Sequence, residues 1–282
     1  MIKFMFINPI SELVTSSWLA ENLENPDLKI IDCRFQLGQP IWGYEQYQKS
    51  HIPGAYYLDL DRDLSSPVAL HGGRHPLPDP DQLAEKLSTI GINSGETWVI
   101  AYDDSRFAFA SRLWWLLRYL GHDKVALLDG GWSGWQRNHC PVSEEIPSSL
   151  VGNFIAKPQP DWIMDIETVK ANPENSSSVL IDSRERDRYR GEREPIDPIA
   201  GHIPGAICLP WLEVTDAQGN CLPPEAQKER WADYANSAEM IVYCGSGVTA
   251  CVNLFSLAIA GLSPAKLYPG GWSDWCSYLV EI

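Results

Sequence analysis

Residues 240–249 have the sequence MIVYCGSGVT, in which an apolar run ends at a cysteine followed by a glycine-containing loop. The apolar stretch from Ala250 to Ala260 predicts a helix, so Cys244 falls at a strand-to-helix turn. At such a turn several backbone N–H groups lack a helical partner, and the positive end of the helix dipole faces the loop. This setting favours the thiolate of Cys244, which is the nucleophilic form of cysteine.

The chain contains an internal duplication whose elements keep one order. IIDCR at residues 30–34 returns as LIDSR at 180–184, HIPGA at 51–55 returns unchanged at 202–206, and the GGWS-x-W pattern at 130–135 returns at 270–275. A segment rich in Pro, Ser and Glu separates the copies. We therefore predict an N-terminal domain at residues 1–140, a linker at 141–160 and a C-terminal domain at 161–282.

Short β-like runs alternate with helical stretches in each half. Residues 98–101 and 124–128 read as strands, whereas 110–119 reads as a helix. This alternation predicts α/β domains, each with a mainly parallel sheet flanked by helices. Ligands bind at the carboxyl ends of strands in such sheets, which is where Cys244 is placed.

The first half lacks the cysteine loop. Aligning residues 99–102 with 240–243 places Asp103 opposite Cys244, and the residues that follow, 104–107, include no glycine. A carboxylate does not replace a thiolate nucleophile. The C-terminal copy is therefore predicted to be catalytic, and the N-terminal copy to be an inactive scaffold that helps to wall the cleft.

Composition and charge exclude several classes of function. The chain has 282 residues, 44% of them hydrophobic, and a net charge of −15, which disfavours nucleic acid as a partner. An anionic substrate would need a locally positive pocket. The first six residues are too short for a signal peptide, and no apolar run approaches a membrane span. The seven cysteines include no Cys-x-x-Cys and indicate neither a disulfide framework nor a zinc site, so we expect a cytoplasmic protein without metal or membrane contact.

Taken together, these motifs resemble the tandem-domain rhodanese sulfurtransferases over nearly the whole chain. CGSGVT at 244–249 is similar to the active loop of the 3-mercaptopyruvate branch, whereas the thiosulfate branch carries basic residues after its cysteine. The Asp-x-Arg, HIPGA and GGW elements of both halves match as well. The resemblance implies two rhodanese-like domains that move a sulfane sulfur from 3-mercaptopyruvate or thiosulfate through a Cys244 persulfide to a thiol or cyanide acceptor. It implies no cofactor, and it makes a thioredoxin-like reductant a candidate partner.

The resemblance also implies an anion cradle and a proton relay. The cradle consists of loop N–H groups of Gly245, Ser246, Gly247, Val248 and Thr249. The relay consists of Ser246 with two residues of the first half, Asp61 and His75. His71 competes with His75 for this role. A helix cap at Ser246 and a turn at Asp61 are the structural alternatives.

Arg188 matches an arginine that binds the carboxylate of the donor, a task for which a guanidinium fork has suitable geometry. Animal enzymes of this branch carry a second arginine after a Glu-Pro-Glu-Pro run, but residues 194–197 read EPID here. Arg190 or Arg193 is a candidate substitute, and with Arg184 these arginines form a candidate anion site. The missing match leaves thiosulfate open as the donor.

Several repeated residues have a structural interpretation because the inactive copy also carries them. These are His51 and His202, and the pairs Asp32/Arg34 and Asp182/Arg184. Cys33, Cys208 and Cys251 are interpreted as small buried apolar residues.

Two rival functions use the same kind of loop. A cysteine phosphatase needs an arginine six positions after its cysteine, but residue 250 is alanine, which disfavours this class. A persulfide carrier that delivers sulfur to a protein partner would use the same Cys244 and stays an alternative.

Overall fold

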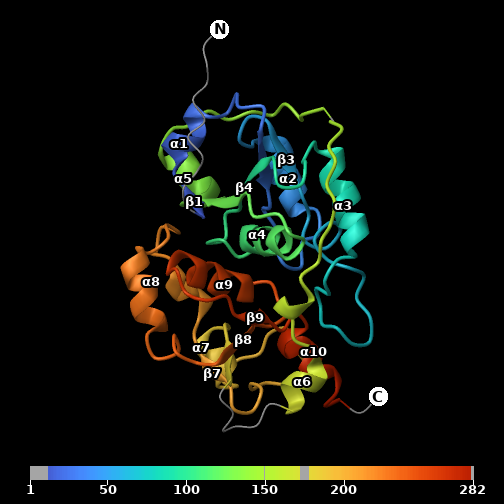
Figure 1. Cartoon of the computed structure of the whole chain (residues 1–282), viewed down its shortest axis with the longest axis vertical. Coiled ribbons are helices and arrows are strands. Elements are labelled where there is room, and N and C mark those ends of the chain that lie inside the picture. The colour runs from blue at the N-terminus through green and yellow to red at the C-terminus, as the bar shows by residue number, and fades with distance from the viewer. Residues whose placement is uncertain (1–11, 149, 172–177, 281–282) are drawn as a thin grey trace.

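The computed structural model describes residues 12–148, 150–171 and 178–280. Within these residues each half of the chain builds one sheet, and the two halves lie one above the other (Figure 1). Parts of the predicted regions lie outside the described residues, namely 1–11, 149, 172–177 and 281–282. The domain limits at 140 and 161 stay a prediction.

The first sheet has the strand order β1-β5-β4-β2-β3, and all its neighbouring strands are parallel. Its strands are β1 (Leu13–Val14), β2 (Leu28–Asp32), β3 (Ala55–Tyr57), β4 (Trp98–Tyr102) and β5 (Val125–Leu128). Its helices are α1 (Ser16–Glu21), α2 (Trp42–Lys49), α3 (Pro80–Thr89), α4 (Ala110–Tyr119) and α5 (Gly131–Arg137).

The second sheet has the order β7-β6-β8-β9 and is also parallel throughout. Its strands are β6 (Ser178–Asp182), β7 (Ile207–Cys208), β8 (Glu239–Tyr243) and β9 (Lys266–Leu267). Its helices are α6 (Ile166–Ala171), α7 (Arg186–Tyr189), α8 (Pro224–Trp231), α9 (Ala250–Ile259) and α10 (Gly271–Ser277), with 3₁₀ turns η1 (Pro160–Trp162) and η2 (Trp211–Val214). The predicted parallel α/β architecture is thus confirmed in both halves.

The layers follow from the alternation of side chains along the strands. In the first sheet Ile30 and Ile100 pack under α1 and α5, whereas Ile31 and Val99 face α3 and α4. The second sheet is covered in the same way, by α6, α7 and α10 on one face and by α8 and α9 on the other. Both faces of both sheets are therefore buried, as is usual for parallel sheets.

The two halves share one core where α4 packs against α9 (Figure 1). The ring of Phe255 lies 5.5 Å from that of Phe107 and 5.4 Å from that of Trp114, measured between centroids. Buried apolar side chains of both helices belong to the same cluster. Because burial of apolar surface is the main stabilising contribution, this contact holds the halves in a defined arrangement.

The predicted linker is attached to the first half along much of its length and then runs past α3 to the second half (Figure 1). Ser143 bridges to His51, the Gly152 N–H donates to the Ser88 carbonyl at 2.8 Å, and the Phe154 side chain is buried in the core. The described parts of this segment, residues 141–148 and 150–160, therefore pack largely against the first half.

The residues interpreted as structural have structural contacts. Arg34 Nη2 donates to Asp32 at 2.6 Å and Arg184 Nη2 to Asp182 at 2.7 Å, with all four side chains buried. His51 and His202 stack on Tyr47 and Tyr189 and contact the carbonyl groups of the same tyrosines. Cys33 and Cys251 are buried as predicted, but Cys208 is only half-buried because β7 lies at the edge of its sheet. None of the described helices has the length and hydropathy that a membrane span requires.

Candidate active site

A cavity of about 240 Å³ opens at the carboxyl end of β8, between the two halves of the chain. Both halves contribute to its wall, as the sequence led us to expect. The lining residues are Leu37, Leu60, Arg74, His75, Ser105, Ala108, Phe109, Arg184, Glu185, Arg188, Ile196, Trp211, Cys244, Gly245, Ser246, Val248 and Thr249.

Cys244 is 2% exposed and directly follows β8, so its loop connects the strand to α9. The loop is held by α10, because the Trp272 N–H donates to the Cys244 carbonyl at 2.8 Å and the Ser273 N–H to the Gly245 carbonyl at 2.9 Å. Gly247 has φ +71°, a conformation that favours glycine. Of the predicted cradle residues, Gly247 alone does not line the cavity.

Ser246 and His75 form the contact that the predicted relay requires. The Ser246 Oγ lies 2.7 Å from His75 Nδ1, and His75 Nε2 lies 3.3 Å from Asp61 Oδ1. Ser246 does not cap α9, whose N-cap residue is Thr249. His71 instead pairs with Ser277 at 2.7 Å and stacks on Tyr278, so His75 is the histidine that reaches the cysteine loop.

Two guanidinium groups flank the residue after the cysteine. A Cβ placed on Gly245 would lie 2.9 Å from Nη2 of Arg74 and 3.7 Å from Nη1 and Nη2 of Arg188. Arg74 comes from the loop before α3 in the first half and was not among the arginines predicted for the site. It lies beside Gly245, whereas Arg190 and Arg193, the candidate substitutes, do not line the cavity.

The four arginines at positions 184, 188, 190 and 193 do not form the anion site that the sequence predicted. Arg190 and Arg193 are half exposed and pair with Glu192 and Asp187 outside the cavity. Arg184 lines the cavity but is held by Asp182 and Glu194. The four residues do not converge because only Arg188 lies in α7: Arg184 precedes the helix, Arg190 is its C-cap residue and Arg193 lies beyond it.

Carboxylates hold both guanidinium groups beside Gly245. Arg188 Nη2 donates to Glu194 Oε1 at 2.7 Å and to Asp197 Oδ2 at 3.2 Å. Arg74 Nη1 pairs with the other oxygen of Asp197. Burial raises the pKa of Asp197, and the neighbouring Arg74 acts in the opposite direction.

A further arginine, Arg112, contacts the Cys244 loop. Arg112 of α4 is fully buried and donates from Nη1 to the Gly247 carbonyl and from Nη2 to the His75 carbonyl, both at 3.1 Å. Burial lowers its pKa, and no carboxylate within the described residues pairs with it. Arg112 thus ties the cysteine loop to the loop that carries the histidine, a role that its place in an apolar helix did not reveal.

In the first half, Asp103 occupies the position that corresponds to Cys244. Both oxygens of Asp103 accept backbone N–H groups, Oδ1 from Ser105 and Phe107 and Oδ2 from Phe109 and Ala110, at 2.8–3.1 Å. The carboxylate therefore fills the cradle of its own loop. That this copy is catalytically inactive stays a prediction.

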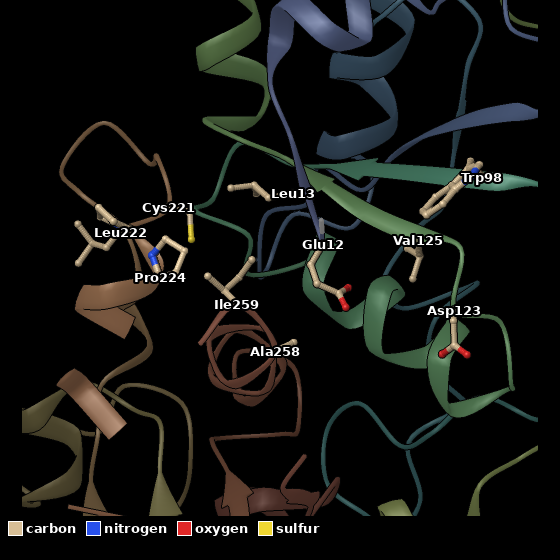
Figure 2. Close-up of a pocket in the computed structure, with 11 residues that line it drawn as sticks. Glu12, Leu13, Trp98, Asp123, Val125, Cys221, Leu222, Pro224, Ala258 and Ile259 are labelled. Carbon is tan, nitrogen blue, oxygen red and sulfur yellow. The ribbon is translucent and has the colours of Figure 1, made fainter. Parts of the chain in front are cut away.

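A larger cavity, of about 520 Å³, lies elsewhere between the halves (Figure 2). Its only cysteine is Cys221, and burial raises the pKa of that thiol to about 12. Glu12 and Asp123 also line it, so its charged lining residues are acidic. It therefore offers neither a thiolate nor a cation for an anionic substrate, unlike the cavity at Cys244.

Comparison with known proteins agrees with this geometry. The rhodanese-like domain family matches residues 15–138 and again residues 165–278. The chain belongs to the rhodanese family. Its two-domain rhodanese fold is shared with the crystal structure of SseA, a 3-mercaptopyruvate sulfurtransferase from Escherichia coli, at a TM-score of 0.82 and 32% identity over 93% of this chain and 99% of that one.

Curated relatives place this rhodanese among the sulfurtransferases. It is 44% identical to a probable 3-mercaptopyruvate sulfurtransferase of Pseudomonas aeruginosa over 94% of this chain and 95% of that protein. It is also 35% identical to a putative thiosulfate sulfurtransferase, SseB, of Mycobacterium tuberculosis over 94% of each chain. The relatives thus include both donor classes named above.

Proposed function

We propose that this sulfurtransferase carries the transferred sulfur on Cys244 and takes it from 3-mercaptopyruvate in preference to thiosulfate. The observation that carries the proposal is the contact of Ser246 with His75 beside a cysteine whose neighbour, Gly245, is flanked by two guanidinium groups. A keto acid needs both a cation for its carboxylate and a group that handles a proton.

The reaction proceeds in two covalent steps. The Cys244 thiolate attacks the sulfur of the donor, the C–S bond breaks, and the electron pair leaves on carbon, which takes a proton to give pyruvate. The resulting persulfide then passes its outer sulfur to a thiol or cyanide and regenerates the thiolate. His75 lies between Ser246 and Asp61 and is the group that moves the proton; Arg188 and Arg74 bind the carboxylate.

The experiment that tests this function compares kcat/KM for 3-mercaptopyruvate and thiosulfate, with cyanide as acceptor. We expect mercaptopyruvate to be preferred at least tenfold. A preference for thiosulfate would reject the donor assignment. Persulfide formation without turnover would favour the alternative, a carrier that delivers sulfur to a protein.

The Ser246–His75 contact predicts a donor-dependent effect. Replacing Ser246 with alanine should lower kcat/KM for 3-mercaptopyruvate by roughly 10- to 100-fold, because general acid–base assistance contributes on that order, and for thiosulfate by less than about threefold. Ser277→Ala is the matched control, since Ser277 pairs with the exposed His71 in the same way. Equal losses with both donors would argue against a proton-handling role.

The position of Arg188 predicts an effect on donor binding. Arg188→Ala should raise KM for 3-mercaptopyruvate by roughly 10- to 100-fold and change kcat much less, because a charge-assisted contact to the carboxylate is lost in the ground state. Arg193→Ala is the control, as Arg193 pairs with Asp187 outside the cavity. An unchanged KM would remove Arg188 from the donor site.

The acceptor and the compartment are further parts of the proposal. All seven cysteines are free, which is typical of a reducing compartment, and we assign the protein to the cytoplasm on this ground. A small thiol or a thioredoxin-like reductant is then the natural acceptor. Faster turnover with reduced thioredoxin than with an equal concentration of a small thiol would support this choice.

A further inference from the structure

Asp197 holds a carboxylate between the two arginines of the donor site. The residue is 8% exposed, and its two oxygens pair with different guanidinium groups, one with Arg74 and one with Arg188. The guanidinium nitrogens next to Gly245 are Nη2 of Arg74 and both Nη atoms of Arg188. The carboxylate of Asp197 thus contacts both guanidinium groups that lie next to Gly245.

The charges of this cluster cancel. The buried or half-buried ion pairs around the cavity join three arginines to three carboxylates, namely Arg74, Arg184 and Arg188 with Asp182, Glu194 and Asp197. An anionic donor therefore meets arginines whose charges are already balanced by carboxylates. At low local dielectric, each further negative charge that the donor brings is poorly compensated.

We propose that Asp197 determines donor specificity, by neutralising the arginine pair so that the site accepts singly charged keto-acid thiols and disfavours doubly charged donors such as thiosulfate. The attraction of the arginines and the repulsion by Asp197 both grow with the charge of a bound anion. Because Asp197 offsets the arginines, a doubly charged donor gains little extra attraction for its larger cost of desolvation. This inference rests on the proposed function and explains its donor preference.

The test replaces Asp197 with asparagine, which keeps an oxygen that can accept from Arg188 and removes one negative charge. The measurement is kcat/KM for thiosulfate and for 3-mercaptopyruvate at pH 8 and low ionic strength. We expect the thiosulfate-to-mercaptopyruvate ratio to rise at least tenfold, and the rise to shrink at high salt. Asp187→Asn is the matched control, with the same change in net charge in the same segment but outside the cavity, and its ratio should stay within twofold.

A second readout does not depend on turnover. Pyruvate and sulfate serve as singly and doubly charged probes that protect Cys244 from alkylation by iodoacetamide. In the unaltered protein pyruvate should protect at a lower concentration than sulfate, and Asp197→Asn should lower the protective concentration of sulfate at least tenfold and that of pyruvate less. Thermal melting of Asp197→Asn, and of Asp197→Ser as a second variant, checks that the variants fold.

The outcomes separate the two proposals. Absence of sulfur transfer from the unaltered protein would reject the proposed function while the protection assay still tests Asp197. An unchanged donor ratio in a folded Asp197 variant, or better protection by sulfate than by pyruvate in the unaltered protein, would overturn the role of Asp197 while sulfur transfer stands.

Discussion

Cys244→Ser should lower kcat for sulfur transfer about a thousandfold or more with every donor, because a serine hydroxyl does not accept a sulfane sulfur as a persulfide. No other cysteine takes over. The nearest in sequence, Cys251, is fully buried in α9, and burial raises the pKa of its thiol to about 12, so it stays protonated at neutral pH.

The fold should survive this change. The loop is held through the backbone carbonyls of Cys244 and Gly245, which serine leaves in place, so we expect a melting temperature close to that of the unaltered protein. Cys140→Ser is the control. Cys140 lies outside the cavity, so this variant should keep the kcat of the unaltered protein. Substantial sulfur transfer by Cys244→Ser would contradict the assignment of the nucleophile. So would a Cys140→Ser variant that fails to gain the mass of one sulfur atom after treatment with the donor.

Gly247→Ala should lower kcat/KM at least a hundredfold. A left-handed φ costs a residue with a Cβ about 1–2 kcal/mol, and the added Cβ at Gly247 would overlap the Pro269 carbonyl. The loop must then shift, and displacing a catalytic group by about 1 Å can cost on the order of a hundredfold in rate. The Gly247 carbonyl would also move away from Arg112.

Gly261→Ala separates the backbone cost from the overlap. Gly261 follows the C-cap residue of α9 and has φ +66°. A Cβ placed there meets no atom within 4 Å. This variant should lose stability by about 1 kcal/mol and keep its kcat/KM. If Gly247→Ala, measured beside that control, kept the kcat/KM of the unaltered protein, the loop conformation would not be required for catalysis.

The duplication made the fold predictable and singled out Cys244 as the candidate nucleophile. The repeated motifs place the strands of the two halves in register, and this alignment sets Asp103 opposite Cys244. The strand and helix that flank it begin and end within a residue or two of the prediction. Such local patterns are strong because each half repeats them independently.

The cations of the site were not predictable in the same way. Arg74 and Arg112 come from the first half. Arg112 reaches the Cys244 loop because α4 packs on α9, and Arg74 reaches it because its loop donates backbone N–H groups to Ser273 and Asp274 of α10. Arg190 and Arg193 were candidates because they are close to Arg188 in sequence, but α7 ends at Tyr189 and both side chains pair with carboxylates outside the cavity. The pairing of Asp197 with two guanidinium groups depends on both halves and has no local signal in the sequence.

The occupied cradle of the first half has a consequence for how such a chain can evolve. Asp103 satisfies four backbone N–H groups, and Arg106 and Phe107 adopt positive φ angles in a loop that contains no glycine. A single reversion of Asp103 to cysteine would strip those donors of their acceptor without restoring the glycines that let a loop bend around a persulfide. A return to cysteine at this position would therefore pass through less stable intermediates, so we expect the specialisation of the two halves to be difficult to reverse.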